Sequence, residues 1–593
     1  MKKTTKMTLF TSVILLLGCA QESNIHNNKQ KTAGETEQAE TTLIATSGLK
    51  EPSQIRQAIV VTSDEQPPTT HTRVKAYSIG EMESIRSINN RQRTKIMRPN
   101  MPYLTHTLQN SEQYDHYDSN GIFIVTEQPV STFSIDVDTA SYSNIRRILN
   151  QGKMPRHDAV RVEELINYFN YQYPKATNGP FSISTEVGPS PYNADKYLLH
   201  IGVQGKVIPQ ADRPPANLVF LLDVSGSMKQ VNKLGLLKNG LKMLTKQLTA
   251  KDSVAIVVYA GAAGTVLKPT SGDNKTAIID ALMQLSAGGS TNGEAGIEGA
   301  YRLAQKAFKK DGINRIILAT DGDFNLGTVN RNALTNLIEN KRKSGIELSI
   351  LGFGSVNYND DLMQKLAQQG NGNAYYIDTL HEARKVLVEE LSSTLFTIAK
   401  DVKIQVEFNP TLVSEYRLIG YESRALKRSE FNNDKVDAGE IGAGHSVTAL
   451  YEISFIDSKN KAHDALRFQP TSKSITTEQH TDELAFLRLR YKPANTEVSQ
   501  LIKQPINKSA TKLTMESSSD NFQFSAAVAG FAQVLRGGEN LSTMAYNDII
   551  DLAQRSKGDD KHGYRAEFIN IVKLAQALAP LIDNQANMLV RHK

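Results

Sequence analysis

The sequence contains a single cysteine in 593 residues. One cysteine cannot form an internal disulfide or a cysteine-based zinc site, so both kinds of stabilised domain are excluded. No block of lysine and arginine is long enough to bind nucleic acid, and the aromatic residues do not interleave with basic ones. We therefore expect no nucleic-acid partner.

The motifs of several large enzyme classes are also missing. The chain has no Gly-x-x-x-x-Gly-Lys phosphate loop, no His-Glu-x-x-His zinc helix and no Gly-x-Ser-x-Gly nucleophile elbow. Its 12 histidines are scattered along the sequence. We predict that the protein is not an enzyme, with catalysis by a serine that a distant histidine approaches in the fold as the alternative.

The N-terminus carries a short export signal. A basic start, Met1–Lys6, precedes an apolar run from Leu9 to Leu17, which is too short for a membrane-spanning helix and is typical of a signal peptide. Residues 16–19, Leu-Leu-Gly-Cys, resemble a bacterial lipobox. That resemblance implies cleavage before Cys19, acylation of Cys19 as a membrane anchor and, because Ala20 follows, the outer membrane of a Gram-negative cell. The alternative is an ordinary signal peptide with an incidental cysteine.

The segment after the signal is poor in aromatic residues and rich in Gln, Asn, Thr, Glu and Ser. Such a composition buries too little apolar surface to offset the entropy of ordering, so we predict a flexible tether over residues 19–120. Without the three signal lysines the formal net charge falls from +6 to +3. A nearly neutral chain gives little information about its partner.

Three folded regions are predicted beyond the tether, and the central one, residues 213–400, alternates strands with helices. That alternation predicts an α/β fold with a doubly wound, mostly parallel sheet covered on both faces. Its strands are expected at 217–222, 254–259, 316–319, 346–353 and 374–377, and a long helix at 380–399.

The flanking regions have a different pattern. Residues 121–212 predict a strand, two helices and two further strands, and Asp136 and Asp138 near the start are better explained by a strand end and helix cap than by metal ligation. Alternating apolar residues at 402–408, 447–455 and 487–491 predict an antiparallel β-sandwich. Three helices, at 522–534, 543–553 and 566–578, complete a C-terminal region of residues 401–593. The apolar stripe of the third is expected to pack in a core.

Oxygen-bearing side chains follow two of the predicted parallel strands. Asp223, Ser225 and Ser227 stand at the end of the first strand, and Asp321 directly follows strand 316–319. Thr291 lies in a glycine-rich loop that can reach the same edge, where the carboxyl ends of the strands meet. Three hydroxyls and two carboxylates are hard ligands that suit Mg²⁺ or Mn²⁺. Each of these three segments, taken alone, is also explained as a helix cap, a turn or a loop.

In this order and setting, the five residues match the metal ion-dependent adhesion site of the von Willebrand factor type A domain, which residues 217–400 resemble. The resemblance implies that Ser225 and Ser227 ligate Mg²⁺ directly, that Thr291 does so in the ligand-competent state, and that Asp223 and Asp321 act largely through waters. Residues 133–173 and the region beyond 401 resemble the flanks of this domain in one group of bacterial lipoproteins that lacks an assigned activity.

The leading functional hypothesis is a membrane-anchored, metal-dependent protein-binding module of the adhesion type. Neutral hydroxyls leave the charge of Mg²⁺ incompletely compensated, so an exposed Asp or Glu of a protein partner is expected as the last ligand. The alternative is an accessory or scaffold lipoprotein in cell-envelope complex assembly. In related domains the last helix shifts on ligand binding, which suggests that the metal site is coupled to the C-terminal region. The sequence does not indicate the oligomeric state.

Overall fold

The computed structural model describes residues 112–135, 138–289, 293–322, 331–354, 358–464, 480–542 and 544–590. They belong to one compact unit that runs from Tyr103 to Lys593. The predicted signal peptide, Cys19 and most of the predicted tether lie outside the described residues. Among the helices of the described part, none is both long enough and apolar enough to cross a membrane.

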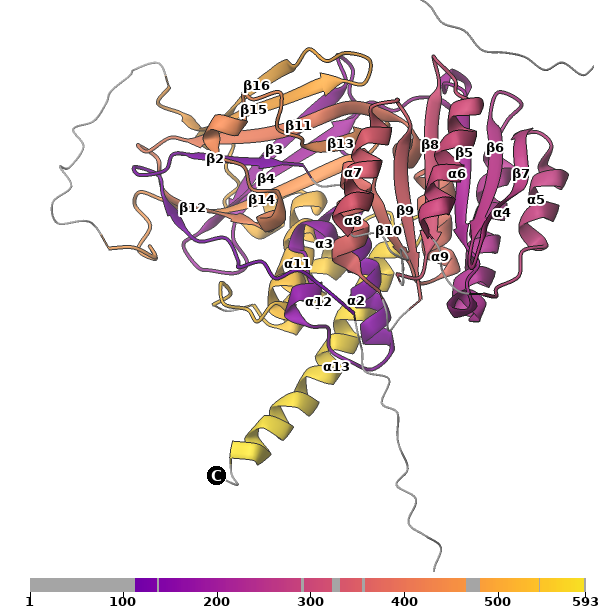
Figure 1. The fold of residues 1–593 in the computed structure, drawn as a ribbon. Helices are drawn as coiled ribbons and strands as arrows, with labels where there is room; N and C mark the ends of the chain where they lie inside the picture. The colour runs from indigo at the N-terminus through magenta and orange to yellow at the C-terminus, as the bar shows by residue number, and fades with distance from the viewer. Residues whose placement is uncertain are drawn as a thin grey trace, which may run out of the picture. The chain divides into compact units, whose positions relative to one another are not determined.

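A six-stranded sheet forms the centre of the 213–400 region (Figure 1). Its order is β10-β9-β8-β5-β6-β7, and all neighbours pair in parallel except β6 and β7. The strands are β5 (Ala216–Asp223), β6 (Ser253–Tyr259), β7 (Ala263–Ser271), β8 (Ile313–Thr320), β9 (Glu347–Phe353) and β10 (Ala374–Ile377). The sequence analysis missed β7 because this edge strand is largely exposed and has no apolar alternation.

Helices cover both faces of this sheet, as predicted for a doubly wound fold. One face packs against α4 (Leu236–Gln247) and α5 (Lys275–Met283), and the other against α6 (Gly293–Lys306), α7 (Arg331–Arg342) and α8 (Asp360–Gln369). The strands between them are buried on both sides, which explains their continuous apolar runs.

The predicted long helix at 380–399 is wrong. The chain instead forms α9 (Leu380–Arg384), a π-helical turn η5 (Lys385–Glu389) and α10 (Leu391–Leu395), and strand β11 begins at Thr397. The last residues of the expected helix therefore pair in a sheet, where Ala399 lies opposite Pro493 and Ile441. Tertiary strand pairing overrides the helical pattern at this end of the segment.

Two antiparallel sheets form a sandwich from both flanking regions. One sheet has the order β1-β12-β14-β4-β3, and the other has the order β13-β11-β15-β16 with β2 also paired to β11. The strands are β1 (Phe123–Ile124), β2 (Val130–Ser134), β3 (Phe181–Pro189), β4 (Tyr197–Gly205), β11 (Thr397–Phe408), β12 (Val413–Ile419), β13 (Gly439–Gly442), β14 (Ser446–Phe455), β15 (Glu483–Pro493) and β16 (Gln500–Asn507). The sequence analysis treated these flanks separately, whereas the structure joins them in one core.

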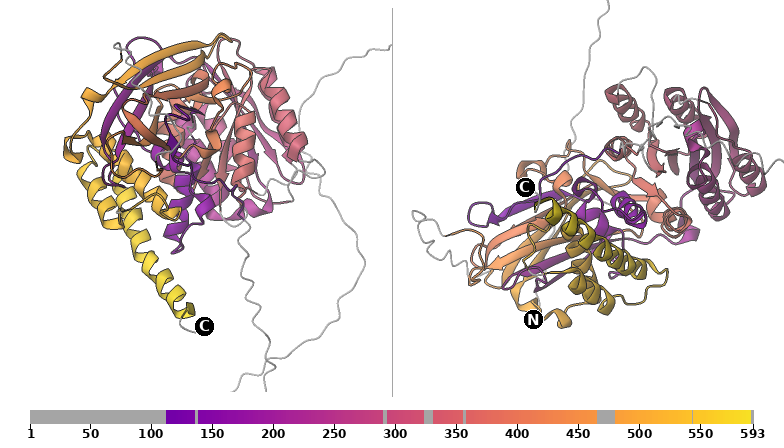
Figure 2. Two further views of the ribbon diagram at one scale, coloured as in Figure 1. Left: turned by 90° about the vertical axis from the view of Figure 1, so that its left-hand side faces the viewer. Right: turned by 90° about the horizontal axis from the view of Figure 1, so that it is seen from below.

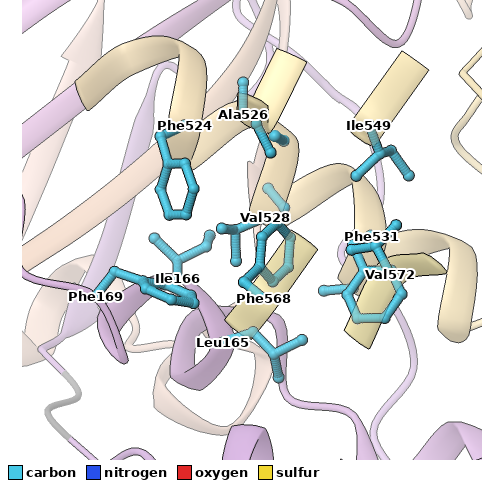
Figure 3. Close-up of a cluster of buried hydrophobic side chains, with 14 of the residues drawn as sticks. Leu165, Ile166, Phe169, Phe524, Ala526, Val528, Phe531, Ile549, Phe568 and Val572 are labelled. Carbon is cyan, nitrogen blue, oxygen red and sulfur yellow. The ribbon is translucent and has the colours of Figure 1, made fainter. Parts of the chain in front are cut away.

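A layer of helices packs on the outer face of the β4–β14 sheet (Figures 1 and 2). Its members are α2 (Ala140–Asn150), α3 (Val162–Asn167), α11 (Asp520–Leu535), α12 (Tyr546–Arg555) and α13 (Tyr564–Val590). Phe169, Phe524 and Phe568 meet edge to face with ring centroids 5.0–5.6 Å apart (Figure 3). Burial of Phe568 and Val572 confirms that the stripe on the last helix packs in a core.

Ordered contacts begin earlier than Phe123, the start of the first predicted strand region. Glu112 is buried and forms an ion pair with Arg147 of α2, and Gln113 forms a β-bridge with Asn359. Residues 112–120, predicted as the end of the tether, therefore include part of the folded unit. Asp138 accepts hydrogen bonds from the Ala374 backbone and from Arg424, which supports a structural role, and Asp136 lies outside the described residues.

Candidate metal centre

The loop after β5 brings the first three predicted ligands together. Asp223 ends the buried central strand, and its Oδ1 accepts a hydrogen bond of 2.8 Å from the Ser225 backbone N–H. The Ser225 and Ser227 hydroxyl oxygens lie 3.0 Å apart. Ser225 is buried whereas Ser227 is exposed, so this pair of hydroxyls leads from the sheet edge to the surface.

The second predicted carboxylate lies at the same edge. Asp321 follows β8, which pairs in parallel with β5 so that Leu222 lies opposite Ala319. Asp321 is buried, with 2% of the residue exposed, at the same edge of the sheet as the buried Asp223. Four of the five predicted residues thus lie at one edge of the sheet, as the rule for carboxyl ends of parallel strands predicts.

Thr291 lies outside the described residues, but the loop that leads to it contacts the site. The Gly226 backbone N–H donates to the Gly289 carbonyl at 3.0 Å, and the Gly288 N–H donates to the Val224 carbonyl at 2.8 Å. Gly289 has a φ of +88°, a conformation that favours glycine. The glycine-rich loop is therefore held against the Asp223–Ser227 loop by backbone hydrogen bonds.

Burial raises the pKa of Asp223 from 3.8 to about 6. The polar groups of Ser225 and the neighbouring Tyr259 hydroxyl lower this pKa, and the Asp321 charge raises it. Among the described residues, no hydrogen bond of good geometry reaches the buried Oδ2 of Asp223. Burying a carboxylate oxygen without a hydrogen bond raises the free energy of the folded state unless a cation or a water molecule compensates it.

Two further residues that were not predicted from the sequence, Tyr259 and Lys233, lie at this edge. Tyr259 ends β6 and lies beside Asp223, and the strand-end rule that found Asp321 would also have found Tyr259. The Lys233 ammonium donates to Asp321 Oδ2 at 2.9 Å. No motif marks Lys233, because a lysine near the start of an amphipathic helix is ordinarily solvated.

The residues present fit a hard divalent cation. Two hydroxyls and two buried carboxylates, one of which has an oxygen without a well-formed hydrogen bond, offer only oxygen donors, the set that Mg²⁺ prefers. No cluster of three or more His, Cys, Asp and Glu that could hold a metal occurs in the described part of the chain. The candidate site differs from such a cluster because it combines only two carboxylates with serine hydroxyls.

Models of three protein families match the chain. Residues 217–389 match the von Willebrand factor type A domain, residues 108–200 match a family described as von Willebrand factor, and residues 393–578 match the C-terminal domain of the uncharacterized protein YfbK. The match to the von Willebrand factor type A domain covers the six-stranded sheet and its helices.

Several known proteins are similar to the chain. The uncharacterized protein YfbK of Escherichia coli K12 is 44% identical over 477 residues, which cover 79% of this chain and 82% of that protein. The uncharacterized protein sll0103 of Synechocystis is 29% identical over 185 residues, 31% of this chain and 43% of that protein. A solved von Willebrand factor type A protein from Catenulispora acidiphila is 14% identical and covers 66% of this chain and 91% of its own, with a TM-score of 0.36 that is too low to establish a common overall fold.

Identity of this level across most of both chains establishes kinship beyond the central domain. The chain therefore belongs to the family of the E. coli protein YfbK, with a von Willebrand factor type A domain between regions that build its β-sandwich and helical layer.

Proposed function

We propose that the edge formed by Asp223, Ser225, Ser227 and Asp321 binds Mg²⁺ or Mn²⁺, completed by Thr291. Von Willebrand factor type A domains generally mediate protein–protein interactions, and the metal would serve that role by accepting an acidic side chain of a partner. Ser225 and Ser227 would hold the ion, and the two carboxylates would orient its waters. The function is thus binding rather than catalysis.

One observation carries this proposal. Two buried carboxylates from adjacent parallel strands lie beside a hydroxyl pair whose outer member, Ser227, is exposed. The two carboxylates are buried, while the neutral Ser227 hydroxyl lies at the surface. An ion held there would keep much of its positive charge toward solvent, which favours an Asp or Glu carboxylate from outside.

The proposal extends to the cell surface. The lipobox-like sequence at Cys19 supports a lipid anchor at the outer membrane, and the composition of the segment after it supports a tether. Acylation at Cys19 would place the type A domain on the membrane without a spanning helix. Metabolic labelling with palmitate tests this anchor, and a Cys19→Ala variant that is labelled equally would contradict it.

Calorimetric titration of the purified chain with Mg²⁺ and Mn²⁺ tests the metal site. We expect one ion bound per chain. Asp223→Ala should lower the affinity for the ion at least tenfold, because a charged member of the site is removed. Asp273→Ala, at an exposed position after β7, is the matched control and should bind as wild type does. Equal binding by Asp223→Ala would contradict the proposal.

A crosslinking pull-down from the cell envelope tests the partner. Proteins that copurify with the wild type in Mg²⁺ should be lost in EDTA and with Asp223→Ala, because the partner carboxylate needs the ion. Captured proteins that persist unchanged in both conditions would show that the metal edge is not the contact. Discrete copurifying envelope complexes would favour the scaffold alternative over adhesion.

A further inference from the structure

A buried lysine occupies the interior side of the candidate metal centre. Lys233 lies in the π-helical turn η4 (Val231–Gly235), and α4 begins at the next residue. Its side chain is 7% exposed, and its Nζ lies 2.9 Å from Asp321 Oδ2. An ammonium group buried to this degree is rare unless it is paired, and here its acidic partner is a predicted metal-site residue.

The backbone leaves room for this lysine. Gly354 directly follows β9, at the same edge of the sheet as Asp321, and a Cβ atom there would lie only 2.2 Å from Lys233 Cε and 3.1 Å from Nζ. Gly354 also has a φ of +80°, which a side chain would strain. The Lys233 side chain therefore packs directly against Gly354, a position where only glycine fits. The buried position of Lys233 thus depends on this glycine.

The ion pair has a direct consequence for cation binding. Asp223 and Asp321 are like-charged groups buried at the same edge of the sheet, at the ends of two paired strands, so the Lys233 charge reduces the cost of burying both carboxylates there. A divalent cation at the same edge would also interact with the negatively charged Asp321 carboxylate. Two cations that share one carboxylate in a poorly solvated site oppose each other.

We propose that Lys233 is an intramolecular competitor of the divalent cation at Asp321, which weakens metal binding and ties metal loading to movement of the lysine side chain. This inference rests on the metal site proposed above. It assigns to Lys233 a tuning role in metal affinity, while the oxygen donors do the binding.

Titration of the full chain with MgCl₂ tests the inference through affinity alone. In Lys233→Gln the amide can still donate to Asp321 but carries no charge, and we expect at least tenfold tighter Mg²⁺ binding than in wild type. Lys233→Met should shift affinity in the same direction. Lys246→Met removes an exposed charge from α4 and should leave the affinity unchanged.

Thermal unfolding with and without Mg²⁺ keeps the test valid if a variant is less stable. Because a ligand that binds the native state raises the melting temperature, Lys233→Gln should gain more from the same Mg²⁺ concentration than wild type. An affinity and a melting shift equal to or smaller than those of wild type would overturn the inference.

The outcomes separate this inference from the proposed metal site. Binding to wild type that is lost in Asp223→Ala, together with equal affinity of wild type and Lys233→Gln, would retain the site and reject the competitor. Binding only to Lys233→Gln would support the competitor and reject metal dependence of the native chain. Absence of binding in wild type and both lysine variants would reject both.

Discussion

At the scale of single residues, position relative to the strands decided what the sequence could predict. Asp223, Ser225, Ser227 and Asp321 were predicted because each follows a recognisable buried strand, and the structure brings these four together. Lys233 was not predictable, because its burial depends on the conformation of Gly354, more than a hundred residues later in the chain.

The buried His200 makes the free energy of unfolding depend on pH. His200 lies in β4 at 2% exposure, 2.9 Å from the Tyr173 hydroxyl, and burial lowers its pKa from 6.5 to about 4. Because the folded pKa lies below the unfolded one, the unfolded chain binds more protons between these values. The contribution of neutral His200 is therefore complete above pH 6.5 and is lost as the pH falls toward 4.

We expect His200 to lower the free energy of unfolding by about 2 kcal/mol between pH 7 and pH 5. Urea unfolding of wild type and His200→Gln at both pH values measures this contribution, since the glutamine variant lacks the titration. An equal loss in the two proteins would contradict the assignment to His200.

At the scale of elements, the doubly wound region and the antiparallel strands followed from apolar periodicity, as did the core-facing stripe of α13. The errors have physical causes. Edge strand β7 is largely exposed, and the expected helix at 380–399 ends at Leu395 because Thr397–Phe408 pairs with β13 and β15. Neither edge exposure nor non-local pairing is visible in a local pattern.

Helix α4 connects the candidate metal centre to the broken segment at 380–395. Lys233 stands just before α4, and a Cβ at Gly240 would lie 3.2 Å from Leu387 and 3.3 Å from Ala383. Because this packing is close, a displacement of Lys233 on metal loading is expected to reach α9 and η5. Hydrogen exchange with and without Mg²⁺ should change in residues 380–395 and stay constant in β15, and unchanged protection of both would show that α4 does not transmit the change.

At the scale of the whole molecule, one arginine joins three segments. Arg146 of α2 is 1% exposed, and its guanidinium donates to Asp378, Glu382 and Glu567. The first two belong to the type A domain and the third to α13. The Tyr168 hydroxyl also accepts from Arg146 and donates to Glu382. The flanking regions and the central domain thus share a buried charge network.

Removing this arginine should be strongly destabilising. We expect Arg146→Met to lower the free energy of unfolding by about 3–5 kcal/mol, because it leaves buried carboxylates without their counter-charge. Arg156→Met removes a guanidinium that is 61% exposed and pairs with Asp158 at 3.5 Å, so it should change stability by less than about 0.5 kcal/mol. Similar urea midpoints for the two variants would show that the network contributes little.

The type A domain leaves and re-enters the sandwich at neighbouring points. The Lys206 carbonyl accepts from the Gly444 N–H, and the Phe396 carbonyl accepts from the Ala443 N–H, so the two ends of the insertion are fixed to consecutive residues. A recombination event at this single junction could therefore exchange one type A domain for another while the sandwich and the helical layer stay intact. The incoming module would have to bring its own acids at positions 360, 378 and 382, because Arg161 would otherwise keep only Glu164, and Arg146 only Glu567, as acidic partners. A few buried ion pairs thus determine whether an inserted domain is compatible with the rest of the fold.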